Sequence, residues 1–147
     1  MTEPKNFVGR YATMARSAPL KPATILIVEN EALVRLELAA ALADMGFIVL
    51  QAENADDAIA LLETHPRIAI LVTDITMPGS MDGLRLAHHV RGRWPPVKIV
   101  VLSGLLDTQL SELPEDSLFV PKPYDARELW PALARMAGET RSHAASR

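Results

Sequence analysis

The sequence predicts an α/β fold in which a parallel five-stranded sheet carries helices on both faces. Three observations support this prediction. Short apolar runs rich in Ile, Val and Leu alternate along the chain with segments of helical periodicity. The first run shows no polar alternation, as expected of a strand that is buried on both faces. Strands that alternate with helices pair in parallel through right-handed crossovers, so a single doubly wound sheet follows.

The first part of this sheet is predicted to contain two strands, each followed by a helix. Thr24–Glu29 (TILIVE) is a β-branched run and predicts the first strand. Glu31–Met45 has helical spacing, and Gly46 is placed to end that helix as a C-terminal cap. Phe47–Ala52 predicts the second strand, and Asn54 can cap the second helix. The apolar residues expected on these two helices are Leu33, Leu36, Leu38, Ala40 and Leu42 in the first and Ala58, Ile59, Leu61 and Leu62 in the second.

The second part of the sheet is predicted to contain three more strands and two more regular helices. Its elements in chain order are a strand at Ile68–Thr73, a helix at Asp82–Trp94, strands at Val97–Leu102 and Leu118–Val120, and a helix at about 125–137. In the last helix Asp125 and Glu128 have the spacing of a capping box. Pro131 falls inside this helical pattern, where it would remove a backbone hydrogen bond, so we expect a late start or a kink.

Five strands linked in this way suggest the flavodoxin-like strand order 2-1-3-4-5, by analogy with other doubly wound proteins. In such sheets the ligand site lies beyond the carboxyl ends of the strands, near the switch between strands 1 and 3. We expect residues 23–138 to form this domain. Residues 1–22 are expected to form an N-terminal arm, with at most a weak helical turn, and residues 139–147 a polar C-terminal tail.

Composition excludes several classes of protein. The chain has 147 residues, 49% of them hydrophobic, which fits one globular domain. A formal net charge of −3 gives no reason to expect nucleic-acid binding, and no apolar run is long enough to span a membrane. No hydrophobic segment at the N-terminus predicts a secretory signal. The chain contains no cysteine, which excludes disulfides and thiolate metal sites and fits a cytoplasmic protein.

Polar residues gather where the predicted strands end. They are Glu29-Asn30-Glu31 after the first strand, Asp74 after the third, Ser103-Gly104 after the fourth and Lys122-Pro123 after the fifth. Carboxylate, amide and main-chain oxygens are suitable ligands for Mg²⁺, which also accepts phosphate oxygens. A carboxylate can act as the nucleophile that forms an aspartyl phosphate, and a lysine with a hydroxyl can neutralise phosphoryl oxygens. The pattern therefore indicates phosphoryl-transfer chemistry that depends on a divalent cation.

Four stretches of the chain closely resemble the signature sequences of response-regulator receiver domains, the phosphoacceptor domains of two-component signalling. They are ILIVENEALVR, VTDITMPGSMDGLRLA, VVLSG and VPKPY, and they occur in the expected order over residues 24–137. The resemblance implies a stand-alone, chemotaxis-like receiver. It further implies a signalling module that assists its own phosphorylation and dephosphorylation, and no metabolic activity.

The resemblance also implies roles for individual residues. Asp74 matches the phosphoacceptor, and Glu29 and Asn30 match the pair of acids that binds Mg²⁺. The main-chain carbonyl of Thr76 is expected to be a further metal ligand. Three positions, Thr76, Gly104 and Lys122, are expected to contact the phosphoryl group.

Two residues are implied to carry the signal away from the site. Ser103 matches the hydroxyl that moves towards the phosphoryl group, and Phe119 occupies the position of the aromatic switch residue. Their movement is expected to remodel the surface formed by the helix after the fourth strand, the fifth strand and the last helix. Pro123 is expected to follow a cis peptide bond that aims Lys122.

The implied partners are a sensor histidine kinase or a histidine phosphotransfer protein, together with a downstream protein that the sequence does not name. A homodimer through the output surface is a further possibility. Neither nucleic acid nor membrane is an expected partner.

The sequence departs from the family pattern in three places. Asn30 stands where an aspartate usually binds Mg²⁺. A charge pair at 4 Å is worth about 4 kcal/mol at an effective dielectric constant of about 20, but water and the retained amide oxygen recover much of that, so we expect Mg²⁺ binding to be weaker by about one or two orders of magnitude. The loop MPGSMDG is one residue longer than its commonest form. Only 18 residues separate Ser103 from Lys122, so the helix between them should be short or partly unwound.

Other functions remain open on the sequence alone. Asn30 favours a pseudo-receiver, which keeps the fold as a protein-binding module without being phosphorylated. A small phosphatase with an aspartyl intermediate would need a second acid and a cap over the substrate, and the chain offers only Glu29 for the first. The adjacent His88 and His89 lack neighbouring ligands and are not expected to bind metal. Trp130 is interpreted as a packing residue or, alternatively, as a partner contact.

Overall fold

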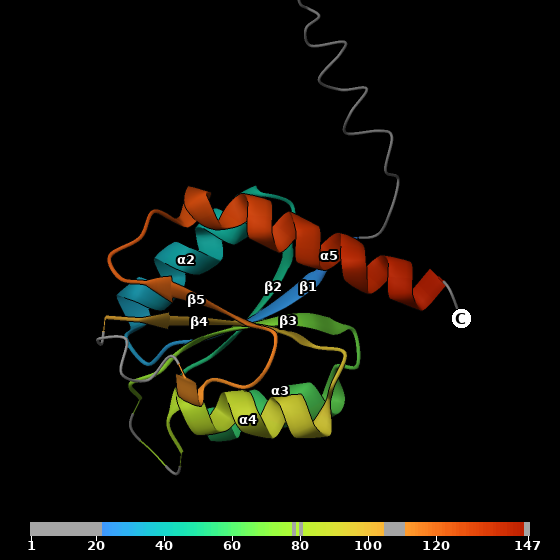
Figure 1. The fold of residues 1–147 in the computed structure, drawn as a ribbon. Coiled ribbons are helices and arrows are strands. Elements are labelled where there is room, and N and C mark those ends of the chain that lie inside the picture. Colours follow the sequence, from blue (N-terminus) through green and yellow to red (C-terminus); the bar gives the residue numbers. More distant parts are fainter. Residues whose placement is uncertain (1–21, 78, 80, 105–110, 146–147) are drawn as a thin grey trace, which may run out of the picture.

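Five strands form one parallel sheet with helices on both faces, as a computed structural model of the chain shows (Figure 1). The structure describes residues 22–77, 79, 81–104 and 111–145, with side chains described as far as residue 138. The predicted arm, up to residue 21, lies outside the described residues. The strand order is β2-β1-β3-β4-β5, which confirms the flavodoxin-like order. Where the structure describes the chain, it contains no helix long and apolar enough to cross a membrane.

The elements agree closely with the predicted ones. In chain order they are β1 (Thr24–Val28), α2 (Ala32–Asp44), β2 (Ile48–Ala52), α3 (Ala55–Thr64), β3 (Ile68–Asp74), α4 (Gly83–Arg93), β4 (Lys98–Ser103), β5 (Ser117–Pro121), the 3₁₀ helix η2 (Ala126–Leu129) and α5 (Trp130–Ala145). Asn54 and Asp82 cap α3 and α4 through side-chain oxygens that accept the backbone N–H groups of Asp57 and Arg85. These caps explain why both helices begin where they do.

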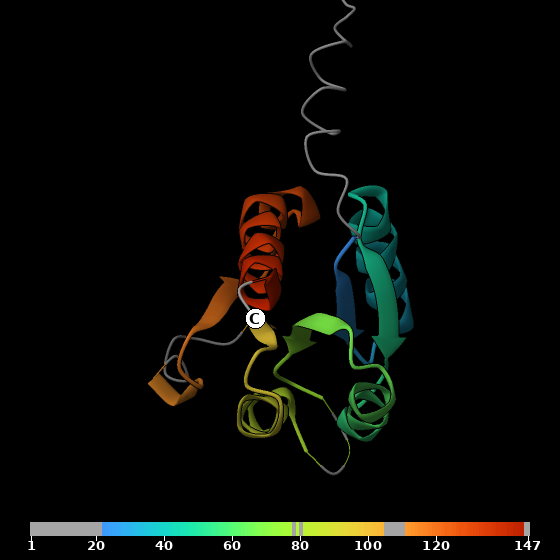
Figure 2. The same ribbon diagram turned by 90° about the vertical axis from the view of Figure 1, so that its right-hand side faces the viewer.

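Helices α2 and α5 cover one face of the sheet, and α3 and α4 cover the other (Figures 1 and 2). Two separate hydrophobic clusters fill the two layers. Ile25, Leu42 and Leu133 are buried in the layer beneath α2 and α5. Leu26, Leu86 and Val90 are buried in the layer above α3 and α4. Each of the central strands β1 and β3 supplies residues to both clusters, which is why Ile25–Val28 of β1 and Ile68–Val72 of β3 are apolar.

The strand register brings the carboxyl ends of the strands together. Val28 of β1 lies beside Thr73 of β3, and Asp74 lies beside Leu102 of β4. Ser103 in turn lies beside Pro121 of β5. The residues that follow these strands therefore meet at one edge of the sheet, as the predicted topology requires.

The apolar residues predicted for α2 are not all buried. Leu38 and Leu42 are buried, but Leu33, Leu36 and Ala40 are exposed. The helix contains so many leucines and alanines that apolar residues surround it, and its sequence does not single out the face that meets the core.

The last helix starts late, which is one of the two outcomes expected from Pro131. Asp125 and Glu128 form the predicted capping box, but they cap the short 3₁₀ helix η2 instead of the α-helix itself. Pro131 is the second residue of α5, in the first turn, where its missing N–H costs no helical bond. The helix continues to Ala145, past the end of the predicted helix at about residue 137.

The segment between β4 and β5 is described only in part. Residues 111–116 contain no α-helix. The expected short or unwound helix falls mainly on residues 105–110, which lie outside the described residues. The described part packs on α4, where His88 Nε2 contacts the carbonyl oxygen of Glu112 and Arg91 Nε donates to that of Glu115 at 3.1 Å.

Candidate functional site

Buried polar side chains mark the edge of the sheet where the strands end. Glu29 follows β1, while Asp74 is the last residue of β3 and Ser103 the last of β4. All three are buried, and Asp74 retains 9% of its surface exposed. Burying a carboxylate is costly unless a partner compensates its charge, so a cation is required nearby.

Lys122 supplies that cation. Its Nζ lies 3.2 Å from Asp74 Oδ2, with hydrogen-bond geometry, and 3.6 Å from Glu29 Oε1. The backbone N–H of Lys122 donates to the carbonyl oxygen of Ser103 at 2.9 Å, which fixes the start of the side chain beside the end of β4. The Lys122–Pro123 peptide bond is cis, as expected. One ammonium group is thus shared between two buried carboxylates.

A hydrogen-bond network holds the loop after β1 in place. Glu29 Oε2 accepts the backbone N–H of Glu31 at 2.9 Å. Arg35 Nη1 donates to the carbonyl oxygen of Glu29 at 2.8 Å, and its Nε donates to Gln51 Oε1 on β2 at 3.3 Å. Sequence reasoning missed Arg35. Its position one turn into α2, beside the acidic loop, is the signal that could have found it.

The loop after β3 approaches the backbone of Asp74 very closely. The N–H of Gly83 donates to the carbonyl oxygen of Ile75 at 2.7 Å. A Cβ atom at position 83 would lie 1.8 Å from the carbonyl oxygen of Asp74 and 2.7 Å from its carbonyl carbon. Only glycine fits there without moving the backbone that carries the Asp74 carboxylate. Sequence reasoning did not single out this glycine.

Two predicted ligand positions lie on the exposed rim of the site. Asn30 and Thr76 are both exposed, Asn30 after β1 and Thr76 after β3. Asn30 lines a shallow pocket of about 270 Å³ whose other described lining residues are Glu53, Asn54, Asp56 and Gly79.

Gly104 and Phe119 lie beside the central cluster. Gly104 is exposed, and the nearest side-chain atom to a Cβ built there is Lys122 Cβ, at 3.8 Å. Phe119 is half-buried in β5 opposite Val101, on the face of the sheet that α3 and α4 cover. The neighbouring Leu118 and Val120 pack into the opposite layer, beneath α2 and α5.

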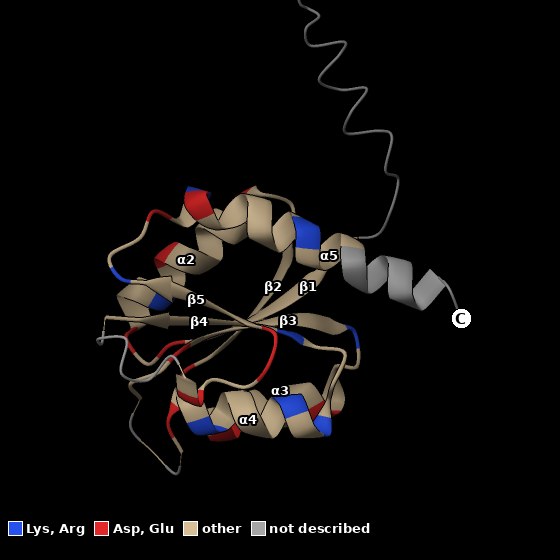
Figure 3. Cartoon of the chain, viewed as in Figure 1, with Lys and Arg blue, Asp and Glu red and all other residues tan. Residues whose placement is uncertain are grey.

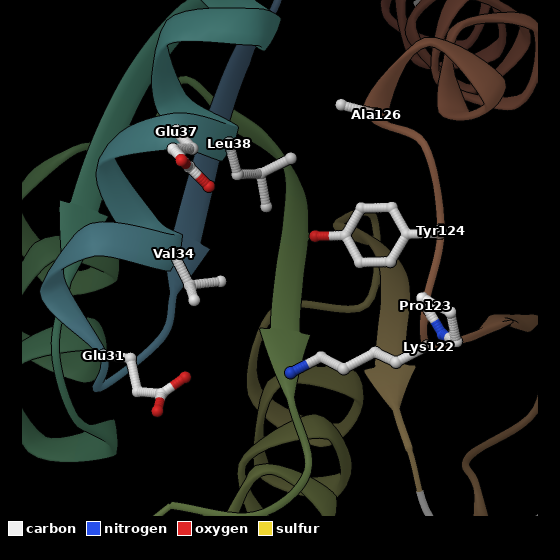
Figure 4. Close-up of a pocket in the computed structure, with 8 residues that line it drawn as sticks. All are labelled: Glu31, Val34, Glu37, Leu38, Lys122, Pro123, Tyr124 and Ala126. Carbon is white, nitrogen blue, oxygen red and sulfur yellow. The ribbon is translucent and has the colours of Figure 1, made fainter.

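A groove of about 590 Å³ lies between the start of α2 and the loop after β5 (Figure 4). The Tyr124 hydroxyl and the Lys122 ammonium both extend from that loop towards α2, which contributes Glu31 and Glu37 (Figure 4). Burial, together with the smaller effect of the negative charges of Glu29 and Asp74, raises the pKa of Tyr124 to about 12. The phenol therefore stays protonated at neutral pH.

The donor atoms at this edge are suitable for a hard divalent cation. Glu29 and Asp74 offer carboxylates, Asn30 an amide oxygen and Thr76 a main-chain carbonyl, an all-oxygen set of the kind Mg²⁺ prefers. Within the described residues no cluster of three or more His, Cys, Asp or Glu side chains is placed to hold a metal ion. The set therefore fits Mg²⁺ in donor type, but with only two carboxylates.

The remaining sequence candidates lie elsewhere. His89 packs edge-on against Trp94, with ring centroids 5.9 Å apart, on the α4 side of the molecule. Trp130 packs against Phe47 at a centroid distance of 5.8 Å and retains 45% of its surface exposed. His89 and Trp130 therefore lie outside the cluster around Asp74.

Comparison with known proteins identifies the arrangement. Residues 25–134 match the family model of the response regulator receiver domain. The chain belongs to the receiver-domain family. It is therefore a domain of the two-component response-regulator type, a family of signalling modules.

Individual receivers are similar in sequence and structure. The crystal structure of a response regulator receiver protein from Sinorhizobium medicae is 29% identical, with a TM-score of 0.74 over 82% of this chain and 98% of that one. The response regulator TrrA from Thermotoga maritima, in complex with Mg²⁺-BeF, is 25% identical with a TM-score of 0.67 over 78% of this receiver and 98% of TrrA. Almost the whole length of each of these two proteins thus shares the fold of this receiver.

A longer relative contains a similar segment. The sensor kinase CckA of Brucella abortus is 33% identical over 111 residues, which are 73% of this receiver and 12% of the kinase. This receiver thus spans about an eighth of that relative's length, and only the receiver segment is shared.

Proposed function

We propose that this receiver is phosphorylated on Asp74 in a reaction that requires Mg²⁺. The observation that carries the proposal is the contact of 3.2 Å between the Lys122 ammonium and the Asp74 carboxylate at the carboxyl edge of the sheet. A carboxylate held next to a cation, and still partly exposed, can react with an incoming phosphoryl group and keep the product's charge compensated.

The chemistry is a transfer of a phosphoryl group between two nucleophiles. A bond forms between an Asp74 carboxylate oxygen and phosphorus, and the bond between phosphorus and the donor atom breaks, with its electron pair leaving on the donor. Lys122 neutralises one phosphoryl oxygen, while Ser103 and the residues after β3 and β4, Thr76 and Gly104, contact the others. Glu29, Asn30, Asp74 and Thr76 would hold Mg²⁺, which supplies further positive charge to the phosphoryl oxygens. The same groups would assist hydrolysis of the aspartyl phosphate.

The signal would leave the site through β5. Ser103 ends β4, and its main-chain carbonyl already accepts the N–H of Lys122. We propose that Ser103 moves towards the phosphoryl group and that Phe119, half-buried in β5, changes its packing with it. The remodelled surface comprises the segment between β4 and β5, β5 itself and α5.

We propose that the phosphoryl donor is a sensor histidine kinase or a histidine phosphotransfer protein, in the cytoplasm. The similarity to a segment of the sensor kinase CckA supports a place in such a system. We propose a downstream protein or self-association as the output, and the chain's net charge of −3 gives no electrostatic support for nucleic acid as the partner.

The test is intact-mass spectrometry after incubation with phosphoramidate and Mg²⁺. We expect a gain of one phosphoryl group in the wild type, no gain in Asp74→Ala, and a full gain in the matched control Asp57→Ala, whose carboxylate is exposed in the first turn of α3. The variant Lys122→Ala should be phosphorylated at least about tenfold more slowly, since one charge-assisted contact is lost. Equal gains in Asp74→Ala and wild type would refute the assignment.

A pseudo-receiver is the second candidate, and Asn30 is the observation that favours it. With a neutral amide at this position only Glu29 and Asp74 bring charge to the metal. If the wild type gains no phosphoryl group even at millimolar Mg²⁺ with a phosphorylated kinase as donor, and Asn30→Asp restores the gain, this second candidate is correct.

A further inference from the structure

Helix α2 presents an apolar stripe to solvent. Leu33 and Leu36 have 70% and 54% of their surface exposed, and Ala40 and Ala43 are also exposed. We call these four residues the α2 stripe. Their spacing of three, four and three residues is the a and d pattern of a two-stranded helical seam. The apolar side chains of this stripe are buried only if another surface covers them, so we expect a covering segment.

Helices α3 and α4 do not share this feature. The outward residues of α3 include Asp56, Asp57 and Glu63, and those of α4 include Arg85 and Arg93. Figure 3 shows the same contrast, because α2 is mostly tan whereas α4 carries several charged side chains. Among α2, α3 and α4, the apolar stripe is therefore confined to α2.

A matching pattern occurs in the amino-acid sequence before β1. Phe7, Tyr11, Met14 and Ala18 recur at spacings of four, three and four residues, which is again an a and d pattern. Two such patterns in one chain can form a seam with each other, the large residues of one facing the small residues of the other.

Charge is complementary between the two segments. Glu37 and Asp44 are exposed on α2 at the positions that flank a seam. Residues 1–21 contain the basic residues Lys5, Arg10, Arg16 and Lys21 against one acid, Glu3. A second α2 in an antiparallel pairing would instead bring the same acids against each other, which disfavours a second copy as the occupant.

The described part of the chain also begins close to α2. Ala23 packs in the layer beneath α2 and α5, and its carbonyl oxygen accepts the N–H of Ile48 at 3.0 Å. The preceding Phe47 donates to the carbonyl oxygen of Leu42 in the last turn of α2. From this point the nine residues back to Met14 can extend about 30 Å, while α2 is only about 20 Å long.

From these observations we infer that residues 7–18 pack along the α2 stripe of the same molecule. The tether gives a local concentration of roughly millimolar order, so the contact forms even where the free segment would bind weakly. The occupant is thus a segment of this chain, held by apolar contacts and flanked by opposite charges.

Disulfide trapping in the full-length chain tests the inference, and the absence of native cysteine makes the result unambiguous. The test pair is Met14→Cys with Ala40→Cys, and the matched pair is Met14→Cys with Ala60→Cys, another exposed helical alanine but on α3. Because a disulfide requires the two Cα atoms to come within about 7 Å, mild oxidation reports close approach. We expect the test pair to form an intrachain disulfide at least about tenfold faster than the matched pair.

Three results would overturn the inference. They are equal rates in the two pairs, no disulfide in the test pair, and disulfide-linked dimers as the main product, which would assign the stripe to a second copy. Adding Leu36→Gln to the test pair should slow trapping about fivefold or more, because a polar residue replaces an apolar contact at an exposed position. An unchanged rate would also count against the stripe as the docking surface.

Discussion

Replacing Gly83 with alanine should destabilise the domain strongly, because the new methyl group meets backbone atoms. A Cβ at this position lies 1.8 Å from the carbonyl oxygen of Asp74 and 2.8 Å from Ile75 Cα, whereas such atoms require at least 3.0 Å. Flexible side chains can rotate away from a clash of this kind, but these neighbours are backbone. The end of β3, or the start of α4, must therefore move by more than 1 Å.

The magnitude follows from the cost of overpacking. Forcing atoms into a filled interior typically costs about 1–3 kcal/mol, and the hydrogen bond from Gly83 N–H to Ile75 adds about 1 kcal/mol if it breaks. We expect the free energy of unfolding to fall by about 3 kcal/mol in Gly83→Ala. With a denaturant slope of about 2 kcal/mol/M, the midpoint of urea unfolding should fall by about 1.5 M.

Gly92→Ala is the matched control, since it makes the same substitution in the same helix. Nothing lies within 4 Å of a Cβ built at Gly92, and the position is exposed. Alanine is the better helix former, so this variant should gain about 0.5–1 kcal/mol. Urea unfolding followed by circular dichroism measures both variants. A Gly83→Ala midpoint within about 0.5 M of the wild type would refute the reasoning from close backbone contact.

Three further predictions concern charge. The phenol of Tyr124 should titrate near pH 12, as the ultraviolet difference between wild type and Tyr124→Phe measures, and Glu29→Gln should lower that midpoint without restoring the ordinary value of 10, because burial remains. The hydrogen bond from Arg127 lowers the pKa of Asp125 from 3.8 to about 2. Ionised Asp125 therefore stabilises the fold above pH 3.8, and this contribution disappears as the pH falls towards 2. The variant Asp125→Asn should therefore show a smaller loss of unfolding free energy between pH 3.8 and pH 2 than the wild type. Asn30→Asp should tighten Mg²⁺ binding by about ten- to a hundredfold in calorimetric titration, and an unchanged affinity would show that the amide already ligates as well as a carboxylate.

The sequence predicted the sheet and the central cluster because both depend on local patterns. Short buried runs rich in β-branched residues, such as Ile68–Thr73, are typical of central strands, and parallel topology then brings Asp74 and Lys122 to the same edge. The caps at Asn54 and Asp125 follow from spacing alone, although the latter begins a 3₁₀ helix.

Other features depend on contacts between distant segments, which no local pattern records. Gly83 matters only because α4 approaches the backbone of β3, and Arg35 only because it reaches both Glu29 and Gln51. The exposure of Leu33 and Leu36 was missed for a different reason. A helix that is apolar on all sides gives no periodic signal to choose its buried face.

The unequal burial of the strands has a consequence for local stability. All seven residues of β3 are buried, whereas the edge strand β5 is only partly buried and its last residue is exposed. Amide protons of β3 should therefore exchange with solvent only through global unfolding, while those of β5 should exchange through smaller local openings. Asp74 is thus anchored on a fully buried central strand, and Lys122 follows an edge strand that opens more readily. The lysine side of this ion pair can change its position at low free-energy cost while the aspartate stays fixed.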